Sequence, residues 1–198
     1  MPSLLALSLV LAMGPVCAGD KHHHHHDEHR QHDSHVHGIG ELNLALDGRE
    51  MQIELDSPAA NLVGFEHAPS SAADRAALDQ AVAALEQGER LFVFNRAAGC
   101  RLADVEIESD LIEEKHEGHK HHDEHEERGH HGHEHHGETH ADIKAAYRFE
   151  CDDPGKLEQL TVELFETFGR TERLTVQFVI DDKQGGAELT ASDPVLRF

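Results

Sequence analysis

Histidine is the residue type whose number and spacing carry the chemistry of this sequence. The 198 residues contain 21 histidines, and 20 of them lie in two clusters, between His22 and His37 and between His116 and His140. Only His67 stands alone. A neutral imidazole is a common ligand of Zn²⁺, Cu²⁺ and Ni²⁺, and a zinc ion needs about four donors at roughly 2.0–2.3 Å. The two clusters therefore predict metal binding.

The second cluster has spacings that suit coordination. Pairs two residues apart, such as His119 and His121, can hold an ion from an extended chain, and pairs four apart, such as His121 and His125, can do so from one helical turn. Twenty clustered histidines, at three or four per ion, would bind on the order of five ions, so we expect several exchanging sites. The candidate ligands in this cluster are His116, His119, His121, His122, His125, His130, His131, His133, His135, His136 and His140.

Both clusters lie in segments too polar to bury a core. We expect residues 19–34 to form a disordered His-rich arm and residues 116–140 a disordered metal-binding loop. Aspartates and glutamates between the histidines add oxygen donors and a negative field that concentrates cations. The candidate ligands in the arm are His22, His23, His24, His25, His26, His29 and His32.

A smaller, ordered site is the second hypothesis. His35 and His37 lie two apart at the expected start of a strand, so both side chains would point to one face. His67 follows the next strand in a loop, and His140 or a carboxylate would complete the set. Such a site would bind more tightly than the loop because less chain must be ordered. In the alternative interpretation, His67 is a hydrogen-bonded structural residue and His35 and His37 only end the arm.

Other interpretations of the histidines stay open. A solvated charged loop without a ligand is one. A pH-responsive structural or interaction domain is another, because protonation of all 21 histidines would change the net charge from −22 to about −1 near their ordinary pKa of ~6.5. Protons compete with metal for imidazole, so a pH response would accompany metal binding.

The sequence does not indicate an enzyme. The zinc-protease pattern H-E-x-x-H fails at all three His-Glu starts, where Lys120, Gly129 and Gly137 occupy the last position. No nucleophile-elbow, P-loop or dinucleotide-binding motif is present. Nucleic-acid binding is also disfavoured, since 39 acidic residues against 17 basic ones repel phosphate.

The amino terminus and the cysteines predict export. Residues 1–18 form an uncharged, mostly apolar segment with a plausible cleavage point after Ala18, typical of a signal peptide although its start carries no Lys or Arg. No later apolar run is long enough to span a bilayer. Cleavage leaves Cys100 and Cys151, which predict one disulfide in an oxidising compartment. The alternative is a pair of soft metal ligands.

The rest of the chain predicts an α+β domain of mainly antiparallel strands, with two main helices and two loosely similar halves, 35–115 and 141–198. Alternating apolar residues predict a hairpin over 36–46 and 51–55 that turns at Asp47-Gly48, and strands over 91–94, 102–107, 143–151 and 174–180. Capping and spacing predict helices from Ser70 or Ser71 to about Gly88 and over 154–168. A turn at Gly185-Gly186 would lead to a last strand over 187–191. The His-rich loop would lie between two strands, and a loop of that length usually has a function.

These residues together resemble a known family, the ZrgA-like periplasmic zinc-uptake accessory proteins. The matching stretches include HVHGIGELNLAL (35–46), SPAANLVGFEHAP (57–69), AAGCRL (97–102), YRFECDDPGKLEQL (147–160) and LFETFGRTERLTVQF (164–178). The resemblance implies an α+β domain with a His-rich insert, in the periplasm of a Gram-negative bacterium, that binds zinc beside a zinc import system. It also implies that His35, His37 and His67 are motif histidines.

The sequence thus predicts a non-enzymatic periplasmic protein that captures Zn²⁺ and assists its uptake, with Cu²⁺ or Ni²⁺ as possible further ions. Its partners would be metal ions and a periplasmic or inner-membrane component of a zinc transporter. The alternative within the same chemistry is a buffer that protects against an excess of zinc, copper or nickel.

Overall fold

The structure is a computed structural model and describes residues 36–113 and 140–198. The predicted signal peptide, the arm, His35 and nearly all of the His-rich loop lie outside the described residues. The elements are β1 (Ile39–Asp47), β2 (Glu50–Pro58), α1 (Ala59–Leu62), α2 (Ala72–Leu85), α3 (Gly88–Leu91), β3 (Phe92–Phe94), β4 (Cys100–Glu108), α4 (Asp110–Glu113), β5 (Asp142–Cys151), η1 (Pro154–Lys156), β6 (Gln159–Val162), α5 (Leu164–Thr167), β7 (Arg173–Ile180), β8 (Lys183–Thr190) and β9 (Val195–Arg197).

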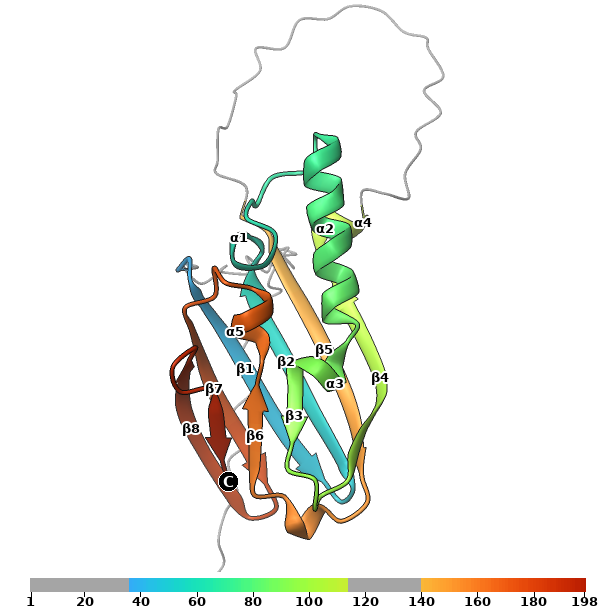
Figure 1. Cartoon of the computed structure of the whole chain (residues 1–198), viewed down its shortest axis with the longest axis vertical. Coiled ribbons are helices and arrows are strands. Elements are labelled where there is room, and N and C mark those ends of the chain that lie inside the picture. Colours follow the sequence, from blue (N-terminus) through green and yellow to red (C-terminus); the bar gives the residue numbers. More distant parts are fainter. Residues whose placement is uncertain (1–35, 114–139) are drawn as a thin grey trace, which may run out of the picture. The chain divides into compact units, whose positions relative to one another are not determined.

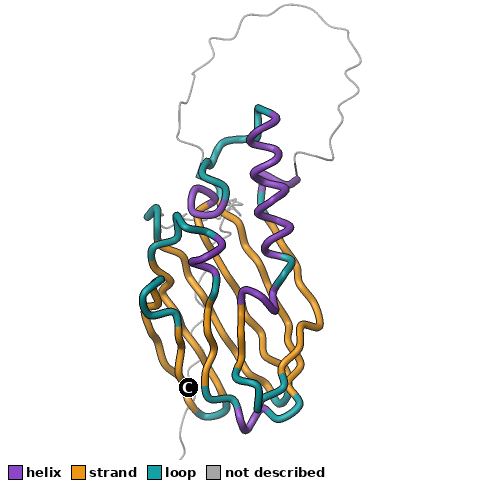
Figure 2. The backbone as a smooth tube through the Cα atoms, in the orientation of Figure 1, coloured by secondary structure: helices purple, strands orange, loops and turns teal. Residues whose placement is uncertain are grey.

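The antiparallel hairpin β1–β2 forms the centre of a six-stranded sheet with the order β4-β5-β2-β1-β7-β8, and the antiparallel pairs β4–β5 and β7–β8 form its two sides. Within the described residues the only parallel pairing in this sheet is between β1 and β7. A second sheet, β3-β6-β9, lies in front of the large one in Figure 1. The predicted α+β class with mainly antiparallel strands is therefore confirmed, and Figure 2 shows more strand than helix in the described backbone.

The core lies on one face of the large sheet. Leu42, Leu44 and Leu46 of β1 are buried, while the residues between them are exposed. The same alternation runs through β2 and β5, where Ile53 and Tyr147 are buried cross-strand neighbours. Strands β3, β6 and β9 and the apolar side of α2 contribute to the same buried cluster. The other face carries the exposed residues, as is common in antiparallel sheets.

Helix α2 begins where its sequence predicts. The Ser71 hydroxyl accepts a hydrogen bond from the backbone N–H of Asp74 at 3.0 Å, and the Asp74 carboxylate accepts one from the backbone N–H of Ser71 at 2.9 Å. This reciprocal capping box satisfies two of the free N–H groups at the helix start. At the other end, the hydroxyl of Tyr147 donates to the carbonyl oxygen of Leu85 at 3.0 Å.

The predicted helix over 154–168 is wrong. A short 3₁₀ turn, strand β6 and the four-residue helix α5 occupy that segment. Its leucines have the three- and four-residue spacing of an amphipathic helix. In the structure, however, Leu160 and Val162 belong to a strand, and their side chains, two residues apart, both face the core. Strand β6 pairs with β3 and β9, which are distant in sequence, so these long-range partners determine its conformation.

The predicted turn at Gly185-Gly186 is also wrong. Both glycines lie inside β8, and the chain turns earlier, at Asp181, whose φ is 52°. A Cβ at position 185 would lie 2.5 Å from the ring of Phe178 on β7. Gly185 therefore serves a close contact between neighbouring strands.

The His-rich loop interrupts a hairpin. Strands β4 and β5 pair antiparallel, and residues 109–141 join them. At the far end of this hairpin Cys100 and Cys151 are directly paired in register and form a disulfide, which confirms the prediction and excludes a thiolate metal site. Among the described residues no helix is long and apolar enough to cross a membrane.

Candidate metal-binding site

Two histidines from different parts of the chain meet on one carboxylate. Nε2 of His37 lies 3.0 Å from Oε1 of Glu66, and Nδ1 of His140 lies 3.1 Å from Oε2 of the same side chain. The Glu66 side chain is 10% exposed, whereas those of His37 and His140 are 65% and 47% exposed. His37 is the last histidine of the first cluster and His140 the last of the second. The two histidine clusters thus end at Glu66.

The carboxylate fixes which ring nitrogens carry a proton. An ionised carboxylate only accepts hydrogen bonds, so Nε2 of His37 and Nδ1 of His140 are the donors in these contacts. In each neutral imidazole the other nitrogen then has the lone pair, which is Nδ1 in His37 and Nε2 in His140. A metal-binding imidazole usually donates its second N–H to a carboxylate in this way.

The short helix α1 holds the backbone beside His37. The buried amide of Asn61 accepts a hydrogen bond from the N–H of Gly38 at 2.7 Å and donates to the carbonyl oxygen of Ile39 at 3.0 Å and the hydroxyl of Ser57 at 3.1 Å. The carbonyl oxygen of Gly38 also accepts hydrogen bonds from the N–H groups of Glu172 and Arg173, at the start of β7. Gly38 has a φ of +85°, and β1 begins only at Ile39. The prediction that His37 lies in the strand is therefore wrong, because the turn at Gly38 sets its direction.

The same helix holds the other two residues. The N–H of Ala59 donates to the carbonyl oxygen of Ala141, the neighbour of His140, at 2.8 Å. After α1 the chain turns at Gly64, whose φ is +92°, and continues to Glu66. A Cβ at Gly64 would lie 2.7 Å from the end of the long Arg170 side chain, which can move aside, so the positive φ is the reason that glycine is favoured there. The backbone beside His37 and His140 is thus hydrogen-bonded to α1, and Glu66 follows α1 in the chain; Figure 1 shows α1 beside the start of β5.

His67 does not join this group. Its ring stacks on Phe65 at a centroid distance of 5.0 Å, and its Nδ1 lies 3.0 Å from the carbonyl oxygen of Ala68. None of its contacts among the described residues is with His37 or His140. Sequence reasoning chose the histidine of the G-F-E-H element, whereas the preceding residue, Glu66, makes the contacts with the other histidines.

The described part of the predicted ligand set thus consists of His37, His67 and His140. Within residues 36–113 and 140–198, no three His, Cys, Asp or Glu side chains converge as a group that would hold a metal ion by itself. His35, the arm histidines and the loop histidines from His116 to His136 lie outside the described residues. The ligand roles predicted for them remain predictions.

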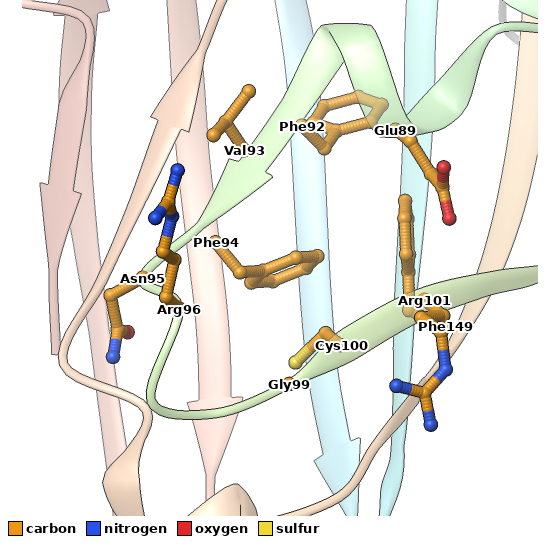
Figure 3. A pocket seen from close by; sticks show the side chains of 10 residues that line it. All are labelled: Glu89, Phe92, Val93, Phe94, Asn95, Arg96, Gly99, Cys100, Arg101 and Phe149. Atoms are coloured by element: carbon orange, nitrogen blue, oxygen red, sulfur yellow. The ribbon is translucent and has the colours of Figure 1, made fainter.

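A cavity of about 370 Å³ lies between β3 and the start of β4, next to the disulfide (Figure 3). Its lining includes three aromatic rings, Phe92, Phe94 and Phe149, and two cationic side chains, Arg96 and Arg101. No histidine lines it. Its two arginines outnumber its one carboxylate, Glu89, and arginines repel cations, so this cavity does not suit a metal ion.

A folded domain that joins two His-rich segments at a carboxylate-bound pair of imidazoles has the features of a protein that handles transition-metal ions. The comparison with protein families agrees: the model of the ZrgA family, described as zinc uptake proteins, matches residues 34–198. The chain belongs to this family, which associates it with zinc and with zinc uptake. Among curated proteins it has no significant match.

Proposed function

We propose that this protein captures Zn²⁺ in the periplasm with its two His-rich segments and passes the ion to a zinc import system. The observation that carries the proposal is the convergence of the two segments on Glu66. The first cluster ends at His37, and the second begins 79 positions later, at His116. Even so, His37 and His140 contact the same side chain. Ions collected by either segment would reach the same place on the folded domain.

The location is supported by two findings. The chain belongs to a zinc uptake family, and its two cysteines outside the predicted signal peptide form a disulfide. Disulfides persist in exported proteins and are rare in the reducing cytosol. The apolar segment 1–18 and the absence of other long apolar runs agree with export and release from the membrane.

The chemistry suits collection and transfer better than storage. Imidazoles present in excess of the four that a zinc ion needs allow the ion to exchange between equivalent ligand sets. The net charge of −22 raises the local concentration of cations before any ligand binds. His37 and His140 are held by the fold, so an ion that reaches them requires less ordering of the chain than one bound elsewhere.

Zinc titration of the full chain tests the proposal. The matched variant is a chain of the same length in which every histidine except His37, His67 and His140 is replaced by Asn, called here the three-histidine variant. All replaced positions lie outside the described residues, so the fold should be retained. We expect the native chain to bind several ions, on the order of five, and the variant to lose most of this capacity. A native chain that binds no Zn²⁺ at neutral pH would contradict the proposal.

Growth experiments distinguish uptake from buffering. If the protein serves uptake, cells carrying the three-histidine variant should grow poorly only when zinc is scarce. Sensitivity only to excess zinc, copper or nickel would instead support the buffering role.

A further inference from the structure

We propose that strand β8 pairs edge to edge with β8 of a second copy of this chain, so that two copies associate through their large sheets. Strand β8 is one of the two outer strands of the six-stranded sheet, and β4 is the other. It lies at the left margin of the sheet in Figure 1. The surface contains no histidine, so the proposal is independent of zinc capture.

The hydrogen bonds of β7 show which backbone groups of β8 point outward. The N–H of Arg173, the first residue of β7, donates to the carbonyl oxygen of Gly38 at 3.0 Å, on the side of β1. Backbone groups alternate in direction along a strand, so the odd-numbered residues of β7 face β1 and the even-numbered ones face β8. The β8 partners of these even-numbered residues carry odd numbers. The groups that point away from the sheet therefore belong to the even-numbered residues Gln184, Gly186 and Glu188.

This stretch of β8 is open to a further strand. Within residues 36–113 and 140–198, no backbone hydrogen bond engages the outward N–H and C=O groups of these three residues. The next outward groups, those of Thr190, are bonded to Asp193, which ends the open stretch. Strand β8 has no proline and no bulge, and residues 184–187 are uncharged and largely exposed. An edge of this kind is a template for pairing with another chain.

The opposite edge of the sheet, β4, is blocked. The N–H of Leu102 donates to the carboxylate of Glu89 at 3.1 Å. The pairing of β4 with β5 shifts between Leu102 and Asp104, which marks a bulge. Asp104, Glu106 and Glu108 are exposed, so a second copy along β4 would bring carboxylates together. Bulges and charges are common means of preventing edge pairing, and of these two edges only β8 lacks them.

The sequence of β8 is complementary to itself. When two copies run antiparallel about an axis at Gly186, the two Gly186 residues lie opposite each other, and Gln184 lies opposite Glu188 of the second copy. Each of these three pairs of residues can exchange two backbone hydrogen bonds, so that all the open groups are used. On the exposed face, the amide of Gln184 can donate to the carboxylate of Glu188 of the second copy. A glycine at the centre leaves no side chains to collide.

Other registers fit less well. An axis one residue earlier would place Asp182 opposite Glu188 of the second copy, and an axis at Glu188 would oppose two glutamates. An axis one residue after Gly186 would need the outward groups of Thr190, which are already bonded to Asp193. Charge and hydrogen bonding thus favour the same register, and they favour a second copy of this chain as the occupant.

Sedimentation of the full chain at increasing protein concentration tests the association. A chelator prevents the His-rich segments from linking copies through shared metal ions, and added salt screens the repulsion between chains of net charge −22. One strand from each copy makes a small interface, so we expect a weak, reversible equilibrium between monomer and dimer. A chain that stays monomeric at about 1 mM would overturn the proposal.

Substitutions at Gln184 test the register. Gln184→Glu would place a carboxylate opposite Glu188 at two points of the dimer and should weaken association by about 3- to 30-fold. Gln184→Lys should strengthen it, because an ion pair replaces the hydrogen bond. The matched control is Asn43→Asp, which adds the same charge to the exposed face on β1, in the middle of the sheet. Equal weakening by Gln184→Glu and Asn43→Asp would show an effect of net charge alone and overturn the register.

Hydrogen exchange of the backbone amides identifies the surface directly. The N–H groups of Gly185 and Ala187 face β7 and should be protected at every protein concentration. Those of Gln184, Gly186 and Glu188 should exchange rapidly in the monomer and become protected as the dimer forms. A dimer in which these three amides still exchange rapidly would use another surface, and the proposal would fail.

Discussion

The two ends of strand β5 differ in how they are held together. At its start, His140 and Ala141 are attached through hydrogen bonds to Glu66 and to α1. At its end, Cys151 is bonded covalently to Cys100, and the neighbouring Asp152 accepts ion pairs from Arg49 and Arg101 at 3.1 Å and 2.9 Å. The strand has ten residues, so the two ends lie about 33 Å apart.

The two ends of β5 should therefore serve different properties, the disulfide end the stability of the fold and the end near α1 the binding of zinc. The disulfide end is closed by a bond, and Phe92 and Phe94 pack edge-to-face against β5 beside it. The end near α1 carries the exposed imidazoles of His37 and His140, which are held by hydrogen bonds and not by a covalent bond. Changes at the disulfide end should therefore affect the free energy of unfolding, and changes near α1 should affect zinc binding.

Removing the disulfide should give the largest change in stability. We expect Cys100→Ala/Cys151→Ala to lower the free energy of unfolding by about 2–4 kcal/mol, because the unfolded chain regains the entropy of an open loop. Urea unfolding measures this loss, and the native protein with reductant is the control. Zinc affinity should not change. A weaker affinity would show that the two ends of β5 are coupled, and the comparison above would no longer hold.

Replacing Asn61 should affect both properties. Its buried amide makes three hydrogen bonds, so Asn61→Ala should cost about 1–3 kcal/mol and weaken zinc binding through His37. Asn95 offers a matched control near the disulfide end, since its exposed amide also makes three hydrogen bonds, to the backbone of Lys156, Glu158 and Gln159. Asn95→Ala should lower stability less and leave zinc binding unchanged. If both variants bind zinc like the native chain, α1 does not position His37.

Tyr147 should make stability sensitive to alkaline pH. Burial raises the pKa of this phenol above its ordinary value of about 10. The unfolded chain therefore ionises first, and stability should fall as the pH rises above about 10, by roughly 1.4 kcal/mol per pH unit. Tyr147→Phe should remove this dependence and cost about 1 kcal/mol at neutral pH through the lost bond to Leu85. Tyrosinate absorbance reports the group directly, because the chain has one tyrosine. Ionisation of folded Tyr147 near pH 10 would contradict the prediction.

The helix cap should give the smallest effect. Ser71→Ala removes one hydrogen bond at the exposed start of α2 and should cost about 1 kcal/mol. Hydrogen bonds with Ser71, first of all from its backbone N–H, also hold the pKa of Asp74 below its usual value. The stability that the ionised Asp74 carboxylate contributes should therefore be lost as the pH falls through the lowered pKa. Thermal unfolding at neutral and acidic pH measures both effects. A loss of zinc affinity would contradict the assignment of Ser71 to stability alone.

Some elements of the fold could be predicted from the sequence because local residue patterns determine them. Alternating leucines predict β1 and β2 because the side-chain period of a strand is local, and Ser71 predicts the start of α2 for the same reason. Strand β6 escaped prediction because its conformation depends on β3 and β9. Glu66 escaped because the direction of a loop side chain depends on the backbone at Gly64, whose positive φ and contact with Arg170 no local pattern reveals.

The position of the His-rich loop also bears on how this family can vary. The loop joins β4 and β5, whose pairing is closed at the other end by the disulfide. The entropic cost of a longer connection grows only with the logarithm of its length, by about 0.6 kcal/mol for each doubling. Histidines can thus be added or lost by insertion or deletion with little effect on folding. Under the proposed function, the number of ions that the protein binds would then change with the length of the loop, while the fold stays the same.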